Sequence, residues 1–409
     1  MKTTIATVIA FGANGDAARY QRGGWSVPED GFAWTLDDSS TLELPAVDAP
    51  FGFFVELQLN PLIRPAIPRQ RLILSVDGIT IGTEEIRHSG LYAFYCPPSQ
   101  ASTASRLLTI DHPDFYRGLP TERCTAFAVS RVRILPLSEP ATPRGHMESK
   151  VPVVEAGDAE RVSGSPIADL VVGFEMLAGN CEFGGVQRHF GAEPLGLLRF
   201  AGASPEAAVQ GLEEDFLGMG NDLDAIIADN HIAEWMIIDR RYRLRFHSMC
   251  SSRDLTLEQV LKRERTKIAF LRRKFVEDLS GPYKTFIFSD LDGLPLSGAM
   301  PLFLALSRKA DHTLLWIAED KDRAGLVTEI YPGLLKGHIE RFGADASPVG
   351  ISGWLAILTN AVLLRKAVSS TPEPAQRNSA TPWQAAKTFL AGLFNRFTRR
   401  RAPPASPHR

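Results

Sequence analysis

The sequence predicts an all-β sandwich followed by an α+β domain. In residues 1–137, apolar and polar residues alternate with a period of two, and turns rich in Gly and Pro separate the runs. In residues 138–166, Pro and Gly mix with Ser, Glu and Lys and no apolar period survives, which predicts a linker. In residues 167–366, stretches with apolar residues at helical spacing alternate with short continuous apolar runs, which predicts a mixture of helices and strands. A chain of 409 residues is long enough for two domains.

Short strands with tight turns are predicted throughout the first domain. Val55, Leu57 and Leu59 show the two-residue period. Asp77-Gly78 lies between two apolar runs and predicts a hairpin. The strands are expected at 3–11, 32–36, 40–44, 52–59, 70–76, 91–95, 106–110 and 125–135. This pattern favours a β-sandwich of jelly-roll type.

Two tryptophans stand out in this domain. The stretch Gly23-Gly24-Trp25-Ser26-Val27-Pro28-Glu29, followed by Trp34, resembles carbohydrate-binding-like β-sandwich modules of bacterial polysaccharide-associated proteins. The resemblance implies a glycan partner, with Trp25 and Trp34 stacking on sugar rings and Glu29 accepting hydroxyl hydrogen bonds. The alternative is that both indoles belong to the core, because large aromatic side chains usually bury.

Cys181 is the candidate nucleophile of the second domain. A strand-like run at 168–177 leads to Gly179-Asn180, and Phe183, Val186 and Phe190 then follow at helical spacing. Cys181 would lie in the first turn of a helix, where unpaired N–H groups and the helix dipole favour a thiolate. The alternative is a small buried apolar residue.

The same segment carries a second resemblance. Gly179-Asn180-Cys181-Glu182-Phe183-Gly184, then Gln187-Arg188 and the stretch 191–200, looks like the opening motif of a bacterial family described as papain-like cysteine peptidases of unknown function. The match extends over about 169–364. It implies a papain-like α+β domain with Cys181 as nucleophile.

His247, at the end of a predicted strand, is the expected base for Cys181, because an adjacent imidazole would take the thiol proton. His189 lies two turns along the Cys181 helix, roughly 12 Å away, and cannot reach the sulfur. His312 and His338 remain alternatives without a motif. Asp290 is the expected orienting residue, and Asn180 is expected to donate to an oxyanion together with the Cys181 N–H.

Two further segments have functional candidates. The helix expected over 256–279 carries many Lys and Arg residues, which form either a solvated face or an anion site. The tail, 367–409, is expected to be disordered, with a basic amphipathic stretch over 383–397 that is either a membrane-surface anchor or a basic disordered end.

The composition of the chain limits which partners and cofactors can be expected. A net charge of −2 gives no reason to expect nucleic acid. Four scattered cysteines without a C-x-x-C pair give no reason to expect disulfides, zinc or another metal, and we expect no cofactor. No run of 18 uninterrupted apolar residues occurs, so we expect a cytoplasmic protein whose only membrane contact is through the tail.

Two functions follow as hypotheses. The leading one is a thiol-dependent hydrolase or acyltransferase linked to cell-envelope or surface-polysaccharide metabolism, acting on a glycan or envelope-linked substrate. The alternative is a non-catalytic carbohydrate-binding accessory protein in polysaccharide assembly. The first requires Cys181 and His247 in contact, and the second requires a sugar-binding face on the sandwich.

Overall fold

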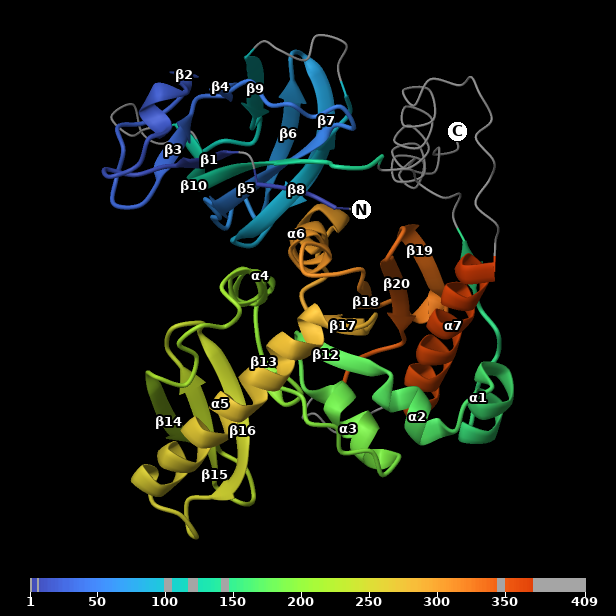
Figure 1. Cartoon of the computed structure of the whole chain (residues 1–409). Helices are drawn as coiled ribbons and strands as arrows, with labels where there is room; N and C mark the ends of the chain where they lie inside the picture. Colours follow the sequence, from blue (N-terminus) through green and yellow to red (C-terminus); the bar gives the residue numbers. More distant parts are fainter. Residues whose placement is uncertain are drawn as a thin grey trace, which may run out of the picture.

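The first domain is a sandwich of two five-stranded antiparallel sheets (Figure 1). The computed structural model describes residues 2–5, 7–98, 105–116, 124–140, 147–343 and 350–370. One sheet contains β1 (Thr7–Ala10), β10 (Thr125–Pro136), β5 (Phe53–Pro61) and β8 (Gly90–Cys96), with β3 (Ala33–Leu36) also paired to β10. The other contains β2 (Gln21–Gly23), β4 (Ser39–Leu44), β9 (Arg106–Asp111), β6 (Gln70–Val76) and β7 (Ile79–Ile86). A 3-10 turn, η1 (Ala17–Arg19), precedes β2.

The predicted β-sandwich is confirmed, and the reason is local. Alternate residues of the strands, such as Leu72 and Leu74 on β6, are fully buried in a core between the sheets. The Asp77-Gly78 turn joins β6 to β7 as expected, with positive φ at both residues, 51° and 77°. That geometry matches the twist of the flanking strands.

The second domain is built on a six-stranded sheet. Four strands run parallel in the order β12 (Phe174–Ala178), β17 (Thr285–Asp290), β18 (Thr313–Glu319) and β20 (Leu334–Ile339). β19 (Val327–Tyr331) and β11 (Glu148–Ser149) extend it in antiparallel orientation. The helices are α1 (Ala156–Ser163), α2 (Ile167–Val172), α3 (Glu182–His189), α4 (Pro205–Glu213), α5 (Leu257–Ser280), α6 (Leu296–Ser307) and α7 (Ile351–Ser370), with the 3-10 turn η2 (Lys321–Arg323).

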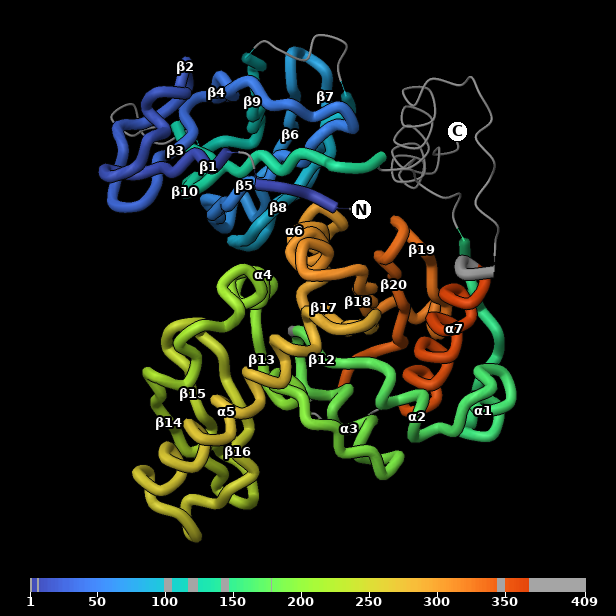
Figure 2. The backbone as a smooth tube through the Cα atoms, in the orientation of Figure 1, coloured from blue at the N-terminus to red at the C-terminus, as the bar shows by residue number. Residues whose placement is uncertain are grey.

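Both faces of this sheet are covered. On β17, Phe286 and Phe288 join the cluster that contains α6, whereas Ile287 between them joins the cluster that contains α7. The continuous apolar sequence of β17 is therefore explained by burial on both sides, as in other parallel sheets. Figure 2 shows α1 and α2 beside α7 at one side of the domain.

A second antiparallel sheet lies beyond β12, at the opposite side (Figure 1). It contains β13 (Ala201–Gly202), β16 (Leu244–Ser251), β15 (Glu234–Asp239) and β14 (Leu223–Ile227) in that order, with α5 packed against β14, β15 and β16. The whole segment is inserted between β12 and β17, which are neighbours in the parallel sheet.

The papain-like α+β expectation is not confirmed, because the core of the second domain is an α/β arrangement. Parallel strands need crossover connections, and α6 supplies one between β17 and β18. The order of a strand-like run at 283–290, a helix start at 301–307 and a strand-like run at 313–318 predicts such a parallel pair, and it is observed. The run 168–177, expected as a strand, is α2 followed by β12.

The segment 138–166, expected to be a linker, is folded in its described part. β11 pairs with β19, and α1 packs against α7 with Ala159 and Ser163 buried. Gly164, at φ 69°, ends α1 in the left-handed conformation that favours glycine. Gly164 and Pro166, the N-cap of α2, therefore mark helix boundaries within the domain. The tail was expected to be disordered over 367–409, but residues 367–370 belong to α7. Residues 371–409, with the amphipathic stretch expected over 383–397, lie outside the described residues.

The two domains share a packed interface. α6 and α4 pack against β8, and Leu91 and Ala93 of β8 belong to the same apolar cluster as α6. Within the interface, the buried Arg133 pairs with Glu56 of the sandwich and with Glu213 of α4. These ion pairs satisfy the buried Arg133 and join the two domains across their interface.

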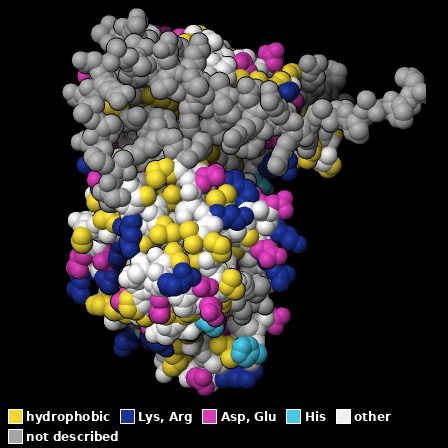
Figure 3. Space-filling view, turned by 90° about the vertical axis from the view of Figure 1, so that its right-hand side faces the viewer, with side chains coloured by type: hydrophobic (Ala, Val, Ile, Leu, Met, Phe, Trp, Pro, Cys, Tyr) yellow, Lys and Arg dark blue, Asp and Glu magenta, His cyan; other side chains and the backbone are white. Residues whose placement is uncertain are grey.

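No helix in the described ranges is both long and apolar enough to cross a membrane. Seen from the side of α7 and α1, the surface mixes hydrophobic side chains with charges of both signs (Figure 3). That mixture agrees with the small net charge of the chain, −2.

Candidate functional site: a cysteine, a histidine and a glutamate

Cys181 occupies the N-cap of α3, directly after β12. Between them, Gly179 turns the chain at φ 98° and exchanges backbone hydrogen bonds with Ala203, at 3.2 and 3.3 Å. A Cβ at Gly179 would lie 2.1 Å from the Ser289 carbonyl oxygen, so β17 passes too close for any side chain there. The expected position at a helix start is observed, and the thiol is partly exposed.

The residues that follow Cys181 hold α3 in place. Glu182, fully buried, accepts hydrogen bonds from the Trp354 indole (3.1 Å) and from the Gly343 N–H (2.9 Å). Gln187 donates to two backbone carbonyls at 3.1 Å, and the buried Arg199 donates to the carbonyls of residues 184 and 192. Most of the motif is therefore scaffold for the cysteine.

His247 comes from the inserted sheet. β13 pairs with β16, and the His247 N–H donates to the Phe200 carbonyl at 3.1 Å, which brings β16 towards α3. The imidazole is hydrogen-bonded with both Cys181 and Glu234, and the bond with Cys181 has the larger effect on its pKa. Together they raise the pKa of His247 to about 9 against the opposing effect of burial. The side chain keeps 29% of its surface exposed, so the pair is open to solvent.

Glu234, on β15, lies against the other side of the ring. Its Oε2 is 3.0 Å from His247 Nδ1, which leaves Nε2 for the thiol. Its Oε1 accepts from the Met249 N–H at 2.7 Å, and only 4% of the side chain is exposed. This geometry needs strained backbone. Ala233 and Met249 have positive φ, 47° and 57°, and the β15–β16 register shifts beside Glu234.

The orienting carboxylate is thus placed differently from the expectation, since Asp290 does not occupy that position. Its carboxylate accepts from the backbone N–H groups of Asp292 (3.1 Å) and Leu294 (2.7 Å) and from the Trp316 indole (3.2 Å). Burial raises the pKa of Asp290 above its ordinary value. Asp290 therefore anchors the turn between β17 and α6, beside Gly179.

A signal for Glu234 was present in the sequence. The apolar runs 234–238 and 242–247, joined by Asp239-Arg240-Arg241, predict a hairpin. In the observed register Met236 lies opposite His247. Glu234 is two residues from Met236, so it is on the same face and diagonal to the histidine. A carboxylate on that face was the natural partner for the imidazole.

The other candidate site residues have different environments. Asn180 Oδ1 accepts from the Glu182 N–H at 3.1 Å, which fixes the side chain beside the cysteine; its donation to an oxyanion remains a prediction. His189 is exposed at the end of α3. His312 is buried and bridges the Leu279 carbonyl and the Lys284 N–H, so it serves the packing of α5.

On the sandwich, the two tryptophans have different environments. Trp25 packs against Phe11, with ring centroids 5.0 Å apart, and donates to the Thr41 carbonyl at 2.8 Å. This is the environment of a core-edge aromatic. Trp34 is half-buried and lies edge-on to Phe32, and Glu29 is exposed. Sugar binding by these residues is still a prediction.

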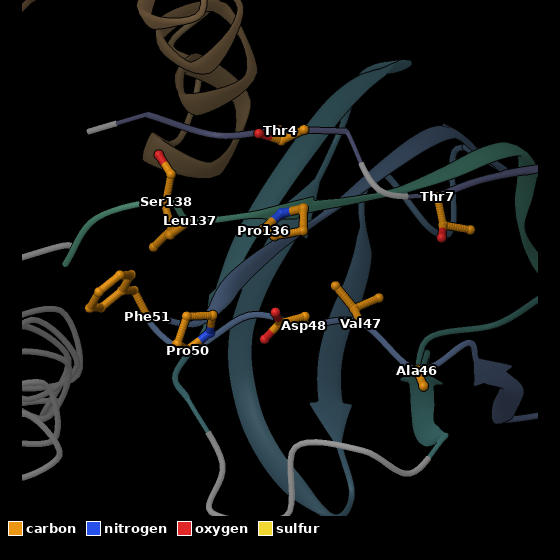
Figure 4. A pocket seen from close by; sticks show the side chains of 10 residues that line it. All are labelled: Thr4, Thr7, Ala46, Val47, Asp48, Pro50, Phe51, Pro136, Leu137 and Ser138. Atoms are coloured by element: carbon orange, nitrogen blue, oxygen red, sulfur yellow. The ribbon is translucent and has the colours of Figure 1, made fainter.

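A shallow cavity of about 430 Å³ lies at one edge of the sandwich (Figure 4). The loop after β4, the start of the chain and the end of β10 surround it. Its lining combines the hydroxyls of Thr4, Thr7 and Ser138, the Asp48 carboxylate, and apolar surface that includes Val47, Pro50 and Phe51. Within the described ranges, no group of three His, Cys, Asp or Glu residues is placed to hold a metal ion.

Comparison with known proteins gives no family. No family model and no curated protein matches the chain. Similar solved structures include the CBM22-1 xylan-binding domain of Paenibacillus barcinonensis Xyn10C (14% identity, 34% of this chain and 98% of that chain, TM-score 0.25). A second is the C-terminal CBM6 of the laminarinase LamC from Zobellia galactanivorans (8%, 31% and 97%, TM-score 0.22).

A third is a GH115 4-O-methyl-α-glucuronidase with specificity for decorated arabinogalactans (14%, 34% of this chain, TM-score 0.24), of which this chain spans 18%. With identities and TM-scores this low, these likenesses carry no argument about function. No matching family model supports the resemblance of the Cys181 segment to papain-like peptidases.

Proposed function

We propose that the protein is a thiol-dependent acyl-transfer enzyme, a hydrolase or acyltransferase, with Cys181 as nucleophile. One observation supports this most strongly: His247 bridges the Cys181 thiol and the buried carboxylate of Glu234. A nucleophile, a base and a group that orients the base, in hydrogen-bonded order, are the parts that nucleophilic catalysis needs.

The proposed steps follow from these positions. The Cys181 thiolate attacks an acyl carbonyl, and the developing oxyanion is stabilised by the Cys181 N–H and the Asn180 amide. The His247 imidazolium gives its proton to the leaving group, and a thioester remains on Cys181. Neutral His247 then takes a proton from water or another hydroxyl, which attacks the thioester and releases the acyl group. Glu234 holds the ring and stabilises its charged form.

A generic activated ester tests this chemistry without knowledge of the substrate. With p-nitrophenyl acetate, we expect a rapid release of about one equivalent of nitrophenolate per protein and one acetyl group on Cys181 in the intact mass. Cys181→Ala should lose both, and Cys250→Ala should keep both, because Cys250 is buried away from the ring. Acetylation spread over several residues, and unchanged in Cys181→Ala, would rule out the proposal.

The sandwich supports a second function, glycan binding, because of the chemistry of its edge cavity. Hydroxyls and a carboxylate beside apolar side chains suit a polyol with an apolar ring face. Under this proposal the envelope or surface polysaccharide is the partner that the sandwich binds.

Affinity electrophoresis against a panel of soluble polysaccharides would test glycan binding. At least one polymer should retard the protein, and Phe51→Ala and Asp48→Asn should each reduce the retardation at least about threefold, the loss of one stacking or hydrogen-bonding contact. Trp34→Ala is the matched variant for the face predicted from sequence. If only Trp34→Ala has an effect, the cavity is not the site, and if no polymer is retarded, glycan binding fails.

A further inference from the structure

Two basic side chains lie on one face of β20, towards the carboxyl end of the parallel sheet. Lys336 and His338 alternate with apolar residues, so both project from the same face of β20. Lys336 lies across from Trp316 and holds its ammonium 4.0 Å from the centre of that ring. Figure 1 shows β18, β20 and β19 side by side.

His338 is the unusual group. Only 2% of its surface is exposed, yet neither ring nitrogen has a hydrogen-bond partner among the described residues. Its Nδ1 is 3.6 Å from Asp320 Oδ2, just beyond hydrogen-bond range. Buried polar groups in native proteins are nearly always satisfied, so a buried imidazole with both nitrogens unpaired points to a ligand.

The surrounding charges select the ligand. Arg323 of η2, Lys336 and Lys150 act electrostatically on His338, opposed by the carboxylate of Asp320. A second carboxylate, that of Asp290, acts on Lys336. Burial and the three cations lower the pKa of His338 to about 4, so the ring is neutral at pH 7. Arg323 is only loosely held, 3.6 Å from Glu148, and 43% of its side chain is exposed.

We propose that Lys336 and His338 form a binding site for an oxyanion, the carboxylate or phosphate of a ligand. The anion would accept from the Lys336 ammonium and from His338 Nε2. Because the bound anion favours the protonated ring, Nδ1 would then donate its own proton to Asp320. Carboxyl ends of parallel strands are where α/β sheets commonly bind ligands. The site is about three strand spacings, roughly 14 Å, from β12, and it does not depend on Cys181 being catalytic.

Sulfate is a suitable probe, because its charge does not change over the pH range used. In NMR spectra of the full chain with labelled histidines, sulfate should shift the His338 imidazole resonance until the site is saturated. Sodium chloride at equal ionic strength serves as the reference. His338→Gln assigns the resonance. Lys336→Met should weaken binding by about tenfold, the loss of one charged hydrogen bond. Lys321→Met removes an exposed lysine of η2 and should leave the affinity unchanged.

Binding should also be tighter at pH 5.5 than at pH 7.5, because the anion favours the protonated ring of His338. A stronger response to acetate than to sulfate would indicate a carboxylate ligand, and the reverse a phosphate. Absence of a saturable shift, or equal affinity in wild type and Lys336→Met, would overturn the proposal. Unchanged unfolding midpoints in the variants would exclude misfolding as the cause.

Discussion

Alkylation of Cys181 by iodoacetamide at pH 7 should slow by about tenfold in His247→Ala. An isolated cysteine thiol is only about 3% ionised at pH 7, whereas a thiolate paired with an imidazolium is mostly ionised. The gain in ionised fraction is partly offset because a stabilised thiolate is a weaker nucleophile. The measurement is the second-order labelling rate at Cys181, followed by peptide mass.

The pH profile gives an independent result. The hydrogen bond with Cys181 is the largest cause that raises the pKa of His247 to about 9, so the imidazolium persists from neutral pH up to about 9. The wild-type labelling rate should therefore be nearly level over this range and change as the ring loses its proton above it. In His247→Ala the rate should instead rise about tenfold per pH unit until the thiol is ionised, near 8.5 for an ordinary cysteine.

Two carboxylate variants separate the observed partner from the one predicted by sequence. Glu234→Gln should give a labelling rate between those of wild type and His247→Ala, because the amide keeps the contact with Nδ1 and removes the charge. Asp290→Asn should label like wild type, since Asp290 contacts a backbone turn and Trp316. Labelling of Cys181 only after unfolding would sink the catalytic proposal and leave the sandwich as the functional part.

Replacing Gly179 with alanine should destabilise the protein by about 2–5 kcal/mol, the sum of left-handed backbone strain and overpacking. The residue has φ 98°, and its new Cβ would meet the Ser289 carbonyl oxygen at 2.1 Å. Since Gly179 directly precedes Asn180 and Cys181, the turn that places the nucleophile must shift. Urea denaturation measures the free energy of unfolding, and alkylation reports the cysteine.

Gly191→Ala is the matched control. Gly191 also has a positive φ, 70°, but its Cβ would meet no atom within 4 Å. The Gly191→Ala variant should lose only the backbone strain, about 1–2 kcal/mol, from its free energy of unfolding. The labelling rate of Cys181 should be unchanged. Equal losses in the two variants would mean that the contact with Ser289 does not constrain the site.

The sequence by itself determined the elements that depend on neighbours along the chain. The sandwich strands follow from alternation, and the hairpin follows from Asp77-Gly78. Ser204 before Pro205, and Thr256 before a helical spacing, predict the starts of α4 and α5. Both residues are the observed N-caps, and Gln259 is the reciprocal partner of Thr256. Cys181 at a helix start and His247 as its partner were also predicted, because a local helix signal and the chemistry of a thiol base were enough.

Tertiary structure alone decided how these elements pair. β12 and β17 are neighbours although a whole inserted sheet separates them in sequence, and short apolar runs do not specify parallel or antiparallel pairing. The orienting residue was missed for the same reason: the choice between Glu234 and Asp290 depends on strand register and on a bulge beside Met249. Register is set by contacts between strands, which periodicity along one strand does not contain.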